Sequence, residues 1–479
     1  MIKYYKRDNM PLEMHKVKIV QALQLLDVDD RLKAITVAGN NTFLLSNKDV
    51  FLDMLTDSGV NAMSDEMQSS MFIADDSYAG SVTYERLSKK IAELFGMEYF
   101  LPAHQGRACE HILCKHFVQK GDVIPMNYRF DSIKEHIKLV GAEYKEFVTD
   151  EAYKTCSDAE FKGNFDVEKF RIFVEKNKNR IPFVRIEAGT NLIGGQPVSY
   201  SNIKNVSEIC KENELLVVLD ASLLQDNLYF IKTREQSCMN KTIKNITREI
   251  ADMVDIIYFS ARKLGFARGG GICVRDIKLF AQLRKYITLY EGFTTYGGMS
   301  VREMEAITIG LEETMNIDVI RQAPEFINYM ASELSIDSIP IVTPPGGLGL
   351  HLDAKAFLPE ISQSQYPAAV LASAIYIVSG VRVMERGTVS AGRDETGKDN
   401  LSKLELVRIA LPRRVFTLSQ INYVVDRIRW LYDNRTLLGG LRFEYEPSEQ
   451  RLYFGKLAPT SDWQNELVEK FKIDFTDSL

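Results

Sequence analysis

Three segments of the 479-residue sequence place reactive or anion-binding groups directly after an apolar run. The run "MVDIIYFSA" is followed by Lys263, and "LLVVLDAS" reaches an acidic residue, Asp220, near its end. In "FLPAHQGRA" a turn with a glycine precedes a helical pattern, and a glycine there lets backbone N–H groups approach an anion. The candidate residues are Lys263, Ser260, Asp220, Gln105, Gly106 and Arg107. They supply an amine, a carboxylate and a phosphate cradle.

Pyridoxal 5′-phosphate (PLP) requires such a set. Its phosphate binds N–H groups and hydroxyls, its aldehyde forms a Schiff base with a lysine, and its pyridinium nitrogen pairs with a carboxylate. Each residue alone has a simpler interpretation, as a surface lysine, a helix N-cap or an ordinary turn. The three features in this order favour the cofactor. A nucleotide is a poor alternative, because the sequence has neither glycine motif typical of nucleotide-binding loops.

A second cluster, "CEHILCKH", resembles a set of metal ligands. It contains Cys109, His111, Cys114 and His116. On a helix these positions point in separate directions at about 100° per residue, whereas zinc needs convergent ligands. Packing and surface roles are therefore favoured over a metal site.

The elements that must position these residues alternate along the chain. Short apolar runs such as "DVIPMNY" and "FVRIEAG" are separated by helical segments such as "YSNIKNVSEICKEN". This alternation predicts a mostly parallel sheet with helices on both faces, and ligands bind at the carboxyl ends of such strands. Nearer the N-terminus, "DDRLKAITVAG" predicts a helix and "NNTFLLS" a strand.

The length of the chain predicts more than one domain, since one hydrophobic core rarely supports so many residues. The helical segment "SVREMEAITIGLEETMN" is a plausible boundary. We expect an N-terminal arm with part of the small domain over residues 1–57, a large PLP-binding domain over 58–312, and a small α+β domain over 313–479.

Composition limits the partners. The net charge of −6 and the lack of a basic block disfavour nucleic acid and anionic membranes. Six cysteines without a C-x-x-C pair are typical of reduced thiols and predict a cytoplasmic protein. The predominantly apolar stretch "YPAAVLASAIYIVSGV" is shorter than the ~20 residues that span a bilayer, so we expect a buried helix running into a strand.

The sequence resembles the β-eliminating lyases of the fold-type I PLP class, whose members are tyrosine phenol-lyases and tryptophanases. The likeness runs from about Asp30 to about Leu457 and includes "LTDSGVNAMSD", "DDSYAGS", "LPAHQGRA", "NLIGGQPVS", "YEGFTTYGG", "GVRVMERGTVSAGR" and "LELVRIALPRRVFT". It implies an aspartate aminotransferase-like α/β fold, with a mostly parallel seven-stranded sheet in the large domain and a smaller α+β domain. It also implies a homotetramer built from catalytic dimers.

The resemblance assigns roles on the cofactor side. Lys263 looks like the Schiff-base lysine and Asp220 like the partner of the pyridinium nitrogen. Gln105, Gly106, Arg107 and Ser260 look like phosphate ligands, Phe130 like the ring stacked on the cofactor, and Asn191 like the neighbour of its phenolic oxygen. The family also binds potassium, and the counterparts here are the carbonyls of Gly59 and Arg268 and the carboxylate of Asp76, where relatives usually carry glutamate.

On the substrate side, Arg408 resembles the arginine that holds the α-carboxylate, and Tyr78 the acid that protonates the leaving carbon. The residues expected to line the substrate pocket are Thr56, Asp131, Phe293, Arg386 and Leu452. The implied reaction is β-elimination of an aromatic L-amino acid, with tyrosine giving phenol, pyruvate and ammonium.

The pocket combines features of two substrate classes. Arg386 matches the arginine that marks tyrosine phenol-lyases, whereas Asp131 and Phe293 are typical of tryptophanases. Leu223 stands where the family has an arginine near the cofactor, and Leu452 where it has phenylalanine or histidine. The alternatives are therefore a tryptophan indole-lyase or a diverged PLP enzyme acting on another amino acid, with a non-catalytic PLP-binding protein disfavoured because Lys263 and Tyr78 are both present.

Overall fold

A computed structural model describes residues 10–476 of the chain. Its contacts divide the chain into two compact units. The large unit comprises residues 58–152 and 159–324, and the small unit comprises residues up to 57, 153–158 and 325–479. Residues 313–324 thus belong to the large unit in this division, and the short segment 153–158 belongs to the small unit. The first nine residues of the expected N-terminal arm lie outside the described residues.

The large unit contains the expected seven-stranded sheet, in the order β2-β8-β7-β6-β5-β3-β4. The pairs β7–β6, β6–β5, β5–β3 and β3–β4 are parallel, whereas β8 runs antiparallel to both of its neighbours. The strands are β2 (Tyr99–Ala103), β3 (Val123–Met126), β4 (Glu143–Glu146), β5 (Val184–Glu187), β6 (Val217–Asp220), β7 (Ile256–Ser260) and β8 (Gly270–Val274). The predicted fold class, α/β with a mostly parallel sheet, is confirmed.

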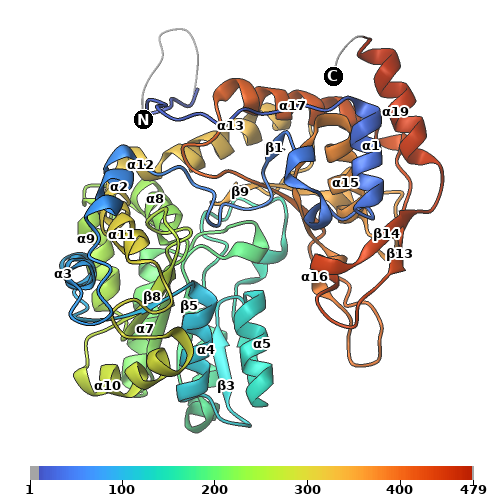
Figure 1. Cartoon of the computed structure of the whole chain (residues 1–479). Coiled ribbons are helices and arrows are strands. Elements are labelled where there is room, and N and C mark those ends of the chain that lie inside the picture. Colours follow the sequence, from blue (N-terminus) through green and yellow to red (C-terminus); the bar gives the residue numbers. More distant parts are fainter. Residues whose placement is uncertain (1–9, 477–479) are drawn as a thin grey trace. The chain divides into compact units, whose positions relative to one another are not determined.

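Alternating residues of the central strands enter two separate cores, one on each face of the sheet. On β6, Val217 and Leu219 pack with one cluster and Val218 with the other, as the period of two in a strand requires. Helices α4 (Gly106–Phe117) and α5 (Asp131–Val140) pack on the Val218 face and lie beside β3 in Figure 1. Apolar residues of α3 (Val82–Phe95), α7 (Tyr200–Glu212), α8 (Leu224–Arg234), α9 (Ile243–Asp252) and α11 (Val301–Glu313) pack in the opposite core. Burial on both faces explains why these strands are continuous apolar runs.

Most of the remaining helices of the large unit begin at a side-chain cap, whereas α8 and α11 do not. The Ser81 hydroxyl accepts a hydrogen bond from the Tyr84 N–H at the start of α3, and Gly96 ends that helix with φ of 63°. The helices are α2 (Asp65–Ser70), α3 (Val82–Phe95), α6 (Val167–Asn177), α7 (Tyr200–Glu212), α8 (Leu224–Arg234), α9 (Ile243–Asp252), α10 (Ile277–Tyr286), α11 (Val301–Glu313) and α12 (Ile317–Ile320).

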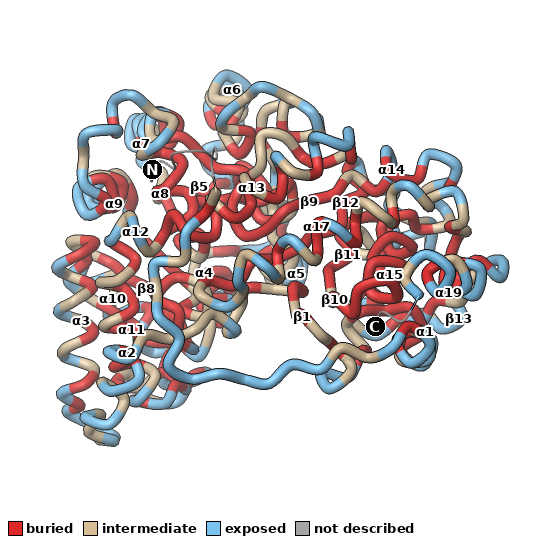
Figure 2. The backbone as a smooth tube through the Cα atoms, turned by 90° about the horizontal axis from the view of Figure 1, so that it is seen from above, coloured by how far each residue is buried: buried red, intermediate tan, exposed pale blue. Residues whose placement is uncertain are grey.

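The small unit is built around a three-stranded antiparallel sheet, β11-β12-β9, and the helix α15. Every residue of α15 (Pro367–Ser379) is buried, and the helix is red along its length in Figure 2, whereas α3 is buried on one side only. The chain then enters β10 (Val381–Arg382), so the stretch "YPAAVLASAIYIVSGV" is the expected buried helix leading into a strand. Within residues 10–476, no helix has the length and hydrophobicity needed to cross a membrane.

The other elements of this unit complete its core or pair at its edges. The strands are β1 (Leu52–Asp53), β9 (Gly349–Asp353), β11 (Met384–Arg386), β12 (Leu406–Ala410), β13 (Leu441–Tyr445) and β14 (Lys456–Pro459). The helices are α1 (Val28–Val37), α13 (Gln322–Ile336, which starts in the large unit), α14 (Ala354–Phe357), α16 (Thr388–Ala391), α17 (Leu418–Asp433), α18 (Arg451–Phe454) and α19 (Trp463–Asp474).

One local expectation is wrong. The segment "NNTFLLS" forms a short 3₁₀ helix, Thr42–Leu44, instead of a strand. The Asn41 side chain accepts a hydrogen bond from the Phe43 N–H and donates to the carbonyls of Leu452 and Gly455. Since a side-chain cap stabilises a helical turn, these local and tertiary bonds override the β-propensity of the segment.

Candidate functional site

Lys263 lies in the turn between β7 and β8, at the carboxyl end of β7. Its backbone N–H donates to the Ser260 carbonyl at 3.1 Å, and its half-buried side chain places Nζ 5.5 Å from the centre of the Phe130 ring. The glycine run after the turn permits close packing. A Cβ on Gly270 would lie 2.4 Å from the Phe259 carbonyl oxygen, so only glycine fits between β7 and the start of α4. The structure therefore brings Lys263 together with Phe130.

The glycine turn before α4 meets the end of β7. A Cβ on Gly106 would lie 3.1 Å from the Cβ of Ser260, so a larger residue would crowd that serine. Gln105 occupies the N-cap position without a side-chain capping bond, and the Arg107 side chain is exposed. The first N–H groups of a helix have no intrahelical partner and carry partial positive charge, so this turn suits a phosphate.

Asp220, at the end of β6, lies in a buried network of charged groups. Its Oδ2 accepts hydrogen bonds from Arg185 Nη2 at 2.6 Å and from the Tyr258 hydroxyl at 2.9 Å. Its Oδ1 accepts from the Ser222 N–H at 2.9 Å, and the Ser222 hydroxyl accepts from the Ser260 N–H. These bonds fix the carboxylate next to the expected phosphate ligand Ser260.

The residues beside Asp220 belong to the same network. The Asn191 N–H donates to Glu187 Oε1 at 3.0 Å, which ties that loop to the end of β5. Leu223 is buried, and a Cβ added to Gly189 would lie 3.0 Å from the Leu223 Cβ. Leu223 therefore fills the space between the loop after β5 and the loop after β6. Asp131 is the first residue of α5, directly after Phe130 at the N-cap position.

Tyr78 and Phe293 contact each other in the large unit. Their rings stack with centroids 4.9 Å apart and planes 21° apart, and the Tyr78 carbonyl accepts a hydrogen bond from the Thr295 hydroxyl. The Tyr78 ring also contacts the Tyr296 ring, with centroids 5.6 Å apart, and Tyr78 remains largely exposed. The structure thus joins the predicted acid to one predicted pocket residue and records no contact between Tyr78 and Lys263.

The three residues expected around potassium differ in their surroundings. The Gly59 N–H donates to the Arg262 carbonyl, and the Arg268 N–H donates to Glu303. Asp76 is exposed and has φ of 45°, in the left-handed region. Within residues 10–476, no group of three or more His, Cys, Asp or Glu side chains could hold a metal ion, but a site built on carbonyls would not require one.

The predicted substrate residues of the small unit gather on one face of its sheet. Arg408 on β12 and Arg386 at the end of β11 are both buried, and Arg408 Nη2 donates to the Leu55 carbonyl at 2.8 Å, next to Thr56. Leu452 instead packs in the core of this unit and lines a small cavity with Phe43 and Val389.

A residue that the sequence interpretation missed, His351 on β9, lies directly opposite Arg408 in the antiparallel register. Side chains of such a pair project from the same face. Its Nδ1 lies 3.1 Å from the Gly349 carbonyl, and its Nε2 has no hydrogen-bond partner among the described residues. Burial, with a smaller contribution from the Arg408 charge, lowers the pKa of His351 to about 3. The imidazole is therefore neutral, and Nε2 is an acceptor beside a guanidinium.

Arg185 and Glu187 were also missed, although the signal was visible. They stand two residues apart in the run "FVRIEAG", so their side chains project from the same face of a buried strand. Charges in that position are rare unless they are paired.

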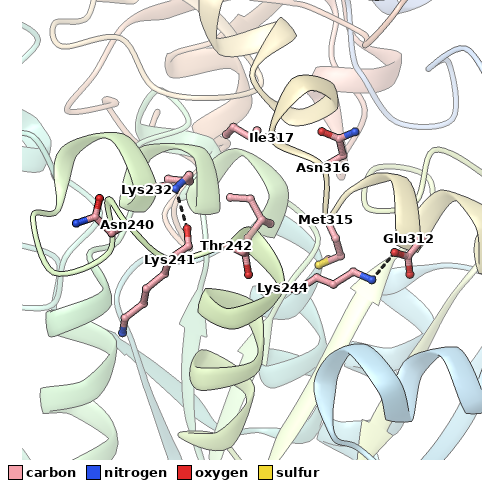
Figure 3. A pocket seen from close by; sticks show the side chains of 10 residues that line it. Lys232, Asn240, Lys241, Thr242, Lys244, Glu312, Met315, Asn316 and Ile317 are labelled. Atoms are coloured by element: carbon pink, nitrogen blue, oxygen red, sulfur yellow. Dashed lines mark hydrogen bonds and ion pairs between the residues drawn. The ribbon is translucent and has the colours of Figure 1, made fainter.

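Two other features do not form part of the site. The side chains of "CEHILCKH" diverge: Cys109 and Cys114 are buried, His111 stacks on His136, and His116 contacts Gln282. A pocket of about 450 Å³ near the start of α9 (Figure 3) is lined by three lysines, Lys232, Lys241 and Lys244. Each has an acceptor: Lys232 the Lys241 carbonyl, Lys241 the Glu249 carboxylate, and Lys244 the Glu312 carboxylate.

The donor set in the large unit fits PLP. A glycine turn at a helix N-terminus, a hydroxyl at the adjacent strand end, a fixed carboxylate and an amine beside an aromatic ring meet the needs of its phosphate, ring nitrogen and aldehyde. The space at Gly106 supports this fit, since a Cβ there would crowd Ser260.

Comparison with known proteins places the chain in a family. The family model for β-eliminating lyases matches residues 53–427. A tyrosine phenol-lyase of Lacrimispora saccharolytica is 40% identical over 463 residues, covering 96% of this chain and 98% of the relative. One from Pasteurella multocida is 39% identical, covering 94% and 99%.

Solved structures support the fold. A Sphingomonas wittichii serine palmitoyltransferase aligns with a TM-score of 0.58 at 12% identity, covering 86% of this chain and 97% of that one. A Leishmania major threonine aldolase aligns with a TM-score of 0.56 at 14% identity, covering 80% and 99%. This chain has the fold-type I architecture and belongs to the β-eliminating lyase family.

Proposed function

We propose that this protein is a PLP-dependent carbon–carbon lyase that splits L-tyrosine into phenol, pyruvate and ammonium. The observation that carries the proposal is the 40% identity to a tyrosine phenol-lyase over nearly the whole of both chains. The large unit supports it, because Lys263, Asp220 and the glycine turn lie at neighbouring strand ends.

PLP, when bound, supplies an electron sink for the electrons left when the Cα–H bond breaks. Lys263 Nζ would hold the cofactor and then remove the α-proton. Asp220 would keep a proton on the ring nitrogen, and the Phe130 ring would stack on the cofactor. Gln105, Gly106, Arg107 and Ser260 would bind the phosphate, and Asn191 would lie near the phenolic oxygen.

Arg408 would hold the substrate α-carboxylate, since a planar guanidinium makes two parallel hydrogen bonds to such a group. Tyr78 would donate the proton that turns the aromatic ring carbon into a leaving group. Acid and base must be separate groups, because the reaction needs two different proton transfers. Arg386, Asp131, Phe293 and Thr56 would shape the side-chain pocket.

A second candidate is a lyase with another aromatic substrate, tryptophan included. His351 supports it, because it places a neutral hydrogen-bond acceptor opposite Arg408 on the same face of the sheet. Asp131 and Phe293, which resemble tryptophanase residues, point the same way.

Three further properties belong to the proposal. We expect a monovalent cation, potassium, at Gly59, Asp76 and Arg268, a homotetramer of catalytic dimers, and a cytoplasmic location. We also propose that the large unit is the PLP-binding domain and the small unit the small α+β domain. A potassium-for-sodium exchange and a sedimentation measurement would test the first two directly.

The deciding experiment is a panel assay. Purified protein with PLP and potassium is offered tyrosine, tryptophan, serine and cysteine, and pyruvate is measured by reduction with lactate dehydrogenase. We expect tyrosine to be the best aromatic substrate, with phenol formed in equal amount. Indole release faster than phenol release would favour the second candidate, and lack of pyruvate from every amino acid would contradict both.

A further inference from the structure

The buried charges around Asp220 come from three adjacent strands and one helix. In the parallel register Glu187 lies opposite Asp220, and Asp220 lies opposite Tyr258. Arg185 is two residues before Glu187 and shares its face. Glu110, on α4, closes the group from above that face. We call these five residues, Glu110, Arg185, Glu187, Asp220 and Tyr258, the buried charge cluster.

Arg185 is the centre of the cluster and is completely buried. Its Nη2 donates to Asp220 at 2.6 Å, its Nε donates to the Tyr258 hydroxyl at 2.9 Å, and its Nη1 donates to Glu187 at 3.1 Å. It also lies 3.8 Å from Glu110 and donates to the Tyr128 carbonyl. The guanidinium therefore donates a hydrogen bond to one carboxylate oxygen of Asp220, and this bond fixes the position of the second oxygen.

The cluster contains one cation and three carboxyl groups. Full ionisation would leave two uncompensated negative charges in a buried site, which is costly. Burial raises the pKa of Glu110 to about 7 and raises the pKa of Glu187. A second positive charge, such as a protonated ring nitrogen beside Asp220, would offset this excess.

Tyr258 links two of the carboxyls through one proton. Its hydroxyl oxygen lies 2.9 Å from Glu110 Oε1 and 2.9 Å from Asp220 Oδ2. A hydroxyl donates only one hydrogen, so both contacts are hydrogen bonds only if one carboxyl carries a proton. With the proton on Glu110, that acid donates to Tyr258 and Tyr258 donates to Asp220, which leaves Asp220 ionised.

We propose that Arg185, Glu187 and Glu110 are positioning residues that set the proton affinity of the pair formed by Asp220 and the ring nitrogen of PLP. The carboxylate of Glu187 offsets the Arg185 charge, protonated Glu110 donates to Tyr258, and Arg185 and Tyr258 orient Asp220. The strength of the electron sink then depends on residues that do not touch the cofactor. This inference rests on the proposed function, because it requires PLP to bind at Lys263.

The test measures the protonation of the ring nitrogen and does not depend on turnover. Enzyme loaded with PLP carrying ¹⁵N in the ring is titrated with pH and followed by ¹⁵N NMR. Glu187→Gln removes a negative charge at nearly constant shape, whereas Arg185→Gln removes the cation. Glu305→Gln is the matched control, since Glu305 is equally buried, pairs with Arg86 and lies outside the cluster.

We expect opposite shifts. Glu187→Gln should lower the pH at which the ring nitrogen loses its proton by about one unit or more, the size expected of a unit charge a few ångströms away at an effective dielectric near 20. Arg185→Gln should raise it, and the double variant, which keeps the net charge, should return it towards the wild type. If Arg185→Gln does not fold, Glu187→Gln and the double variant still give the two required results.

A purely structural cluster would give a different pattern. All variants would then lose stability while the nitrogen titration stayed at the wild-type pH, or both single variants would shift it in the same direction, and either result overturns the inference. If wild-type protein binds PLP normally and Glu187→Gln is unshifted, the inference fails and the proposed function stands. If wild-type protein shows no lysine-bound PLP absorbance, both fail.

Discussion

The seven-stranded sheet of the large unit and the three-stranded sheet of the small unit carry their buried charges in opposite ways. In the large unit, the Arg185 cation is surrounded by three carboxyls and each of its nitrogens has a hydrogen-bond acceptor. In the small unit, Arg386, Arg408 and His351 share one face of the sheet with Asp353, whereas Glu385 projects from the other face. In the first region, carboxyl groups balance the charge of Arg185, which is a permanent part of the fold. In the second region the carboxylate on the same face, Asp353, accepts hydrogen bonds from the first N–H groups of α14, and the planar guanidinium of Arg408 suits an incoming carboxylate.

Replacing Lys263 should have the largest effect of the variants considered. Lys263 is the amine assigned to remove the α-proton, so the large unit would lose that step. Lys263→Ala should lower kcat for tyrosine by roughly 10²–10⁴-fold or more, the usual contribution of a general base. Pyruvate release and the absorbance of lysine-bound PLP would both be measured. Lys241→Ala, at the pocket in Figure 3, is the matched control and should leave both unchanged. A Lys263→Ala enzyme with normal turnover would exclude the assigned role.

Breaking the balance in the large unit should destabilise the fold strongly. Arg185→Met leaves Asp220 and Glu187 buried without their cation, which costs about 3–5 kcal/mol of unfolding free energy. The partly exposed pair Arg429–Glu333 is the comparison, and Arg429→Met should cost at most about 1 kcal/mol. Urea unfolding of the two variants gives both values. Equal losses would mean that burial of the cluster adds nothing.

The face of the small-unit sheet that carries Arg408 and Arg386 is tested by replacing Arg408. Arg408→Lys keeps the charge but loses the planar, two-pronged geometry, so kcat/KM should fall by about 10–100-fold, equivalent to one charge-assisted hydrogen bond. Most of the loss should appear in KM, and Arg382→Lys, at a partly exposed pair with Asp53, should change neither constant. A change in kcat alone would assign Arg408 to the chemical step instead of to binding.

His351 should give the smallest effect, and it has a defined pH dependence. Its pKa of about 3 in the folded protein lies below the value of about 6.5 in the unfolded chain, so the unfolded state binds the extra proton as the pH falls. Stability from this group is therefore complete above about pH 6.5 and is lost progressively towards pH 3, at up to about 1.4 kcal/mol per pH unit.

The variant His351→Phe, close in shape and without a titrating nitrogen, should remove that part of the pH dependence. Unfolding free energies at pH 7 and pH 5 would be compared for the two proteins. An unchanged difference between the two pH values would show that His351 is not buried in its neutral form.

The contrast between the two regions also shows how far the sequence alone could lead. The apolar runs ending at Asp220 and Ser260 predicted the sheet correctly, because strands buried on both faces must be apolar throughout. The charges of Arg185 and Glu187 interrupt one such run, and their meaning depends on the neighbouring strands that pair them. His351 interrupts "GLGLHLD" in the same way, and only the antiparallel register places it against Arg408.

Local errors had a similar origin. "NNTFLLS" has the composition of a strand, but the Asn41 side chain bonds to carbonyls more than 400 residues away, and no local pattern contains that information.

The expected potassium site depends on the carbonyls of Gly59 and Arg268, and side-chain identity does not encode the direction of a carbonyl.

The central claim is that Lys263 and Asp220 serve a PLP cofactor in cleavage of the bond between the β-carbon and an aromatic ring. Its most direct test is the joint measurement of phenol and pyruvate from L-tyrosine by PLP-loaded wild-type and Lys263→Ala protein. The account predicts equal amounts of the two products from the wild type and almost none from the variant. Wild-type protein that shows the lysine-bound PLP absorbance but releases pyruvate without phenol, or neither product, would contradict it.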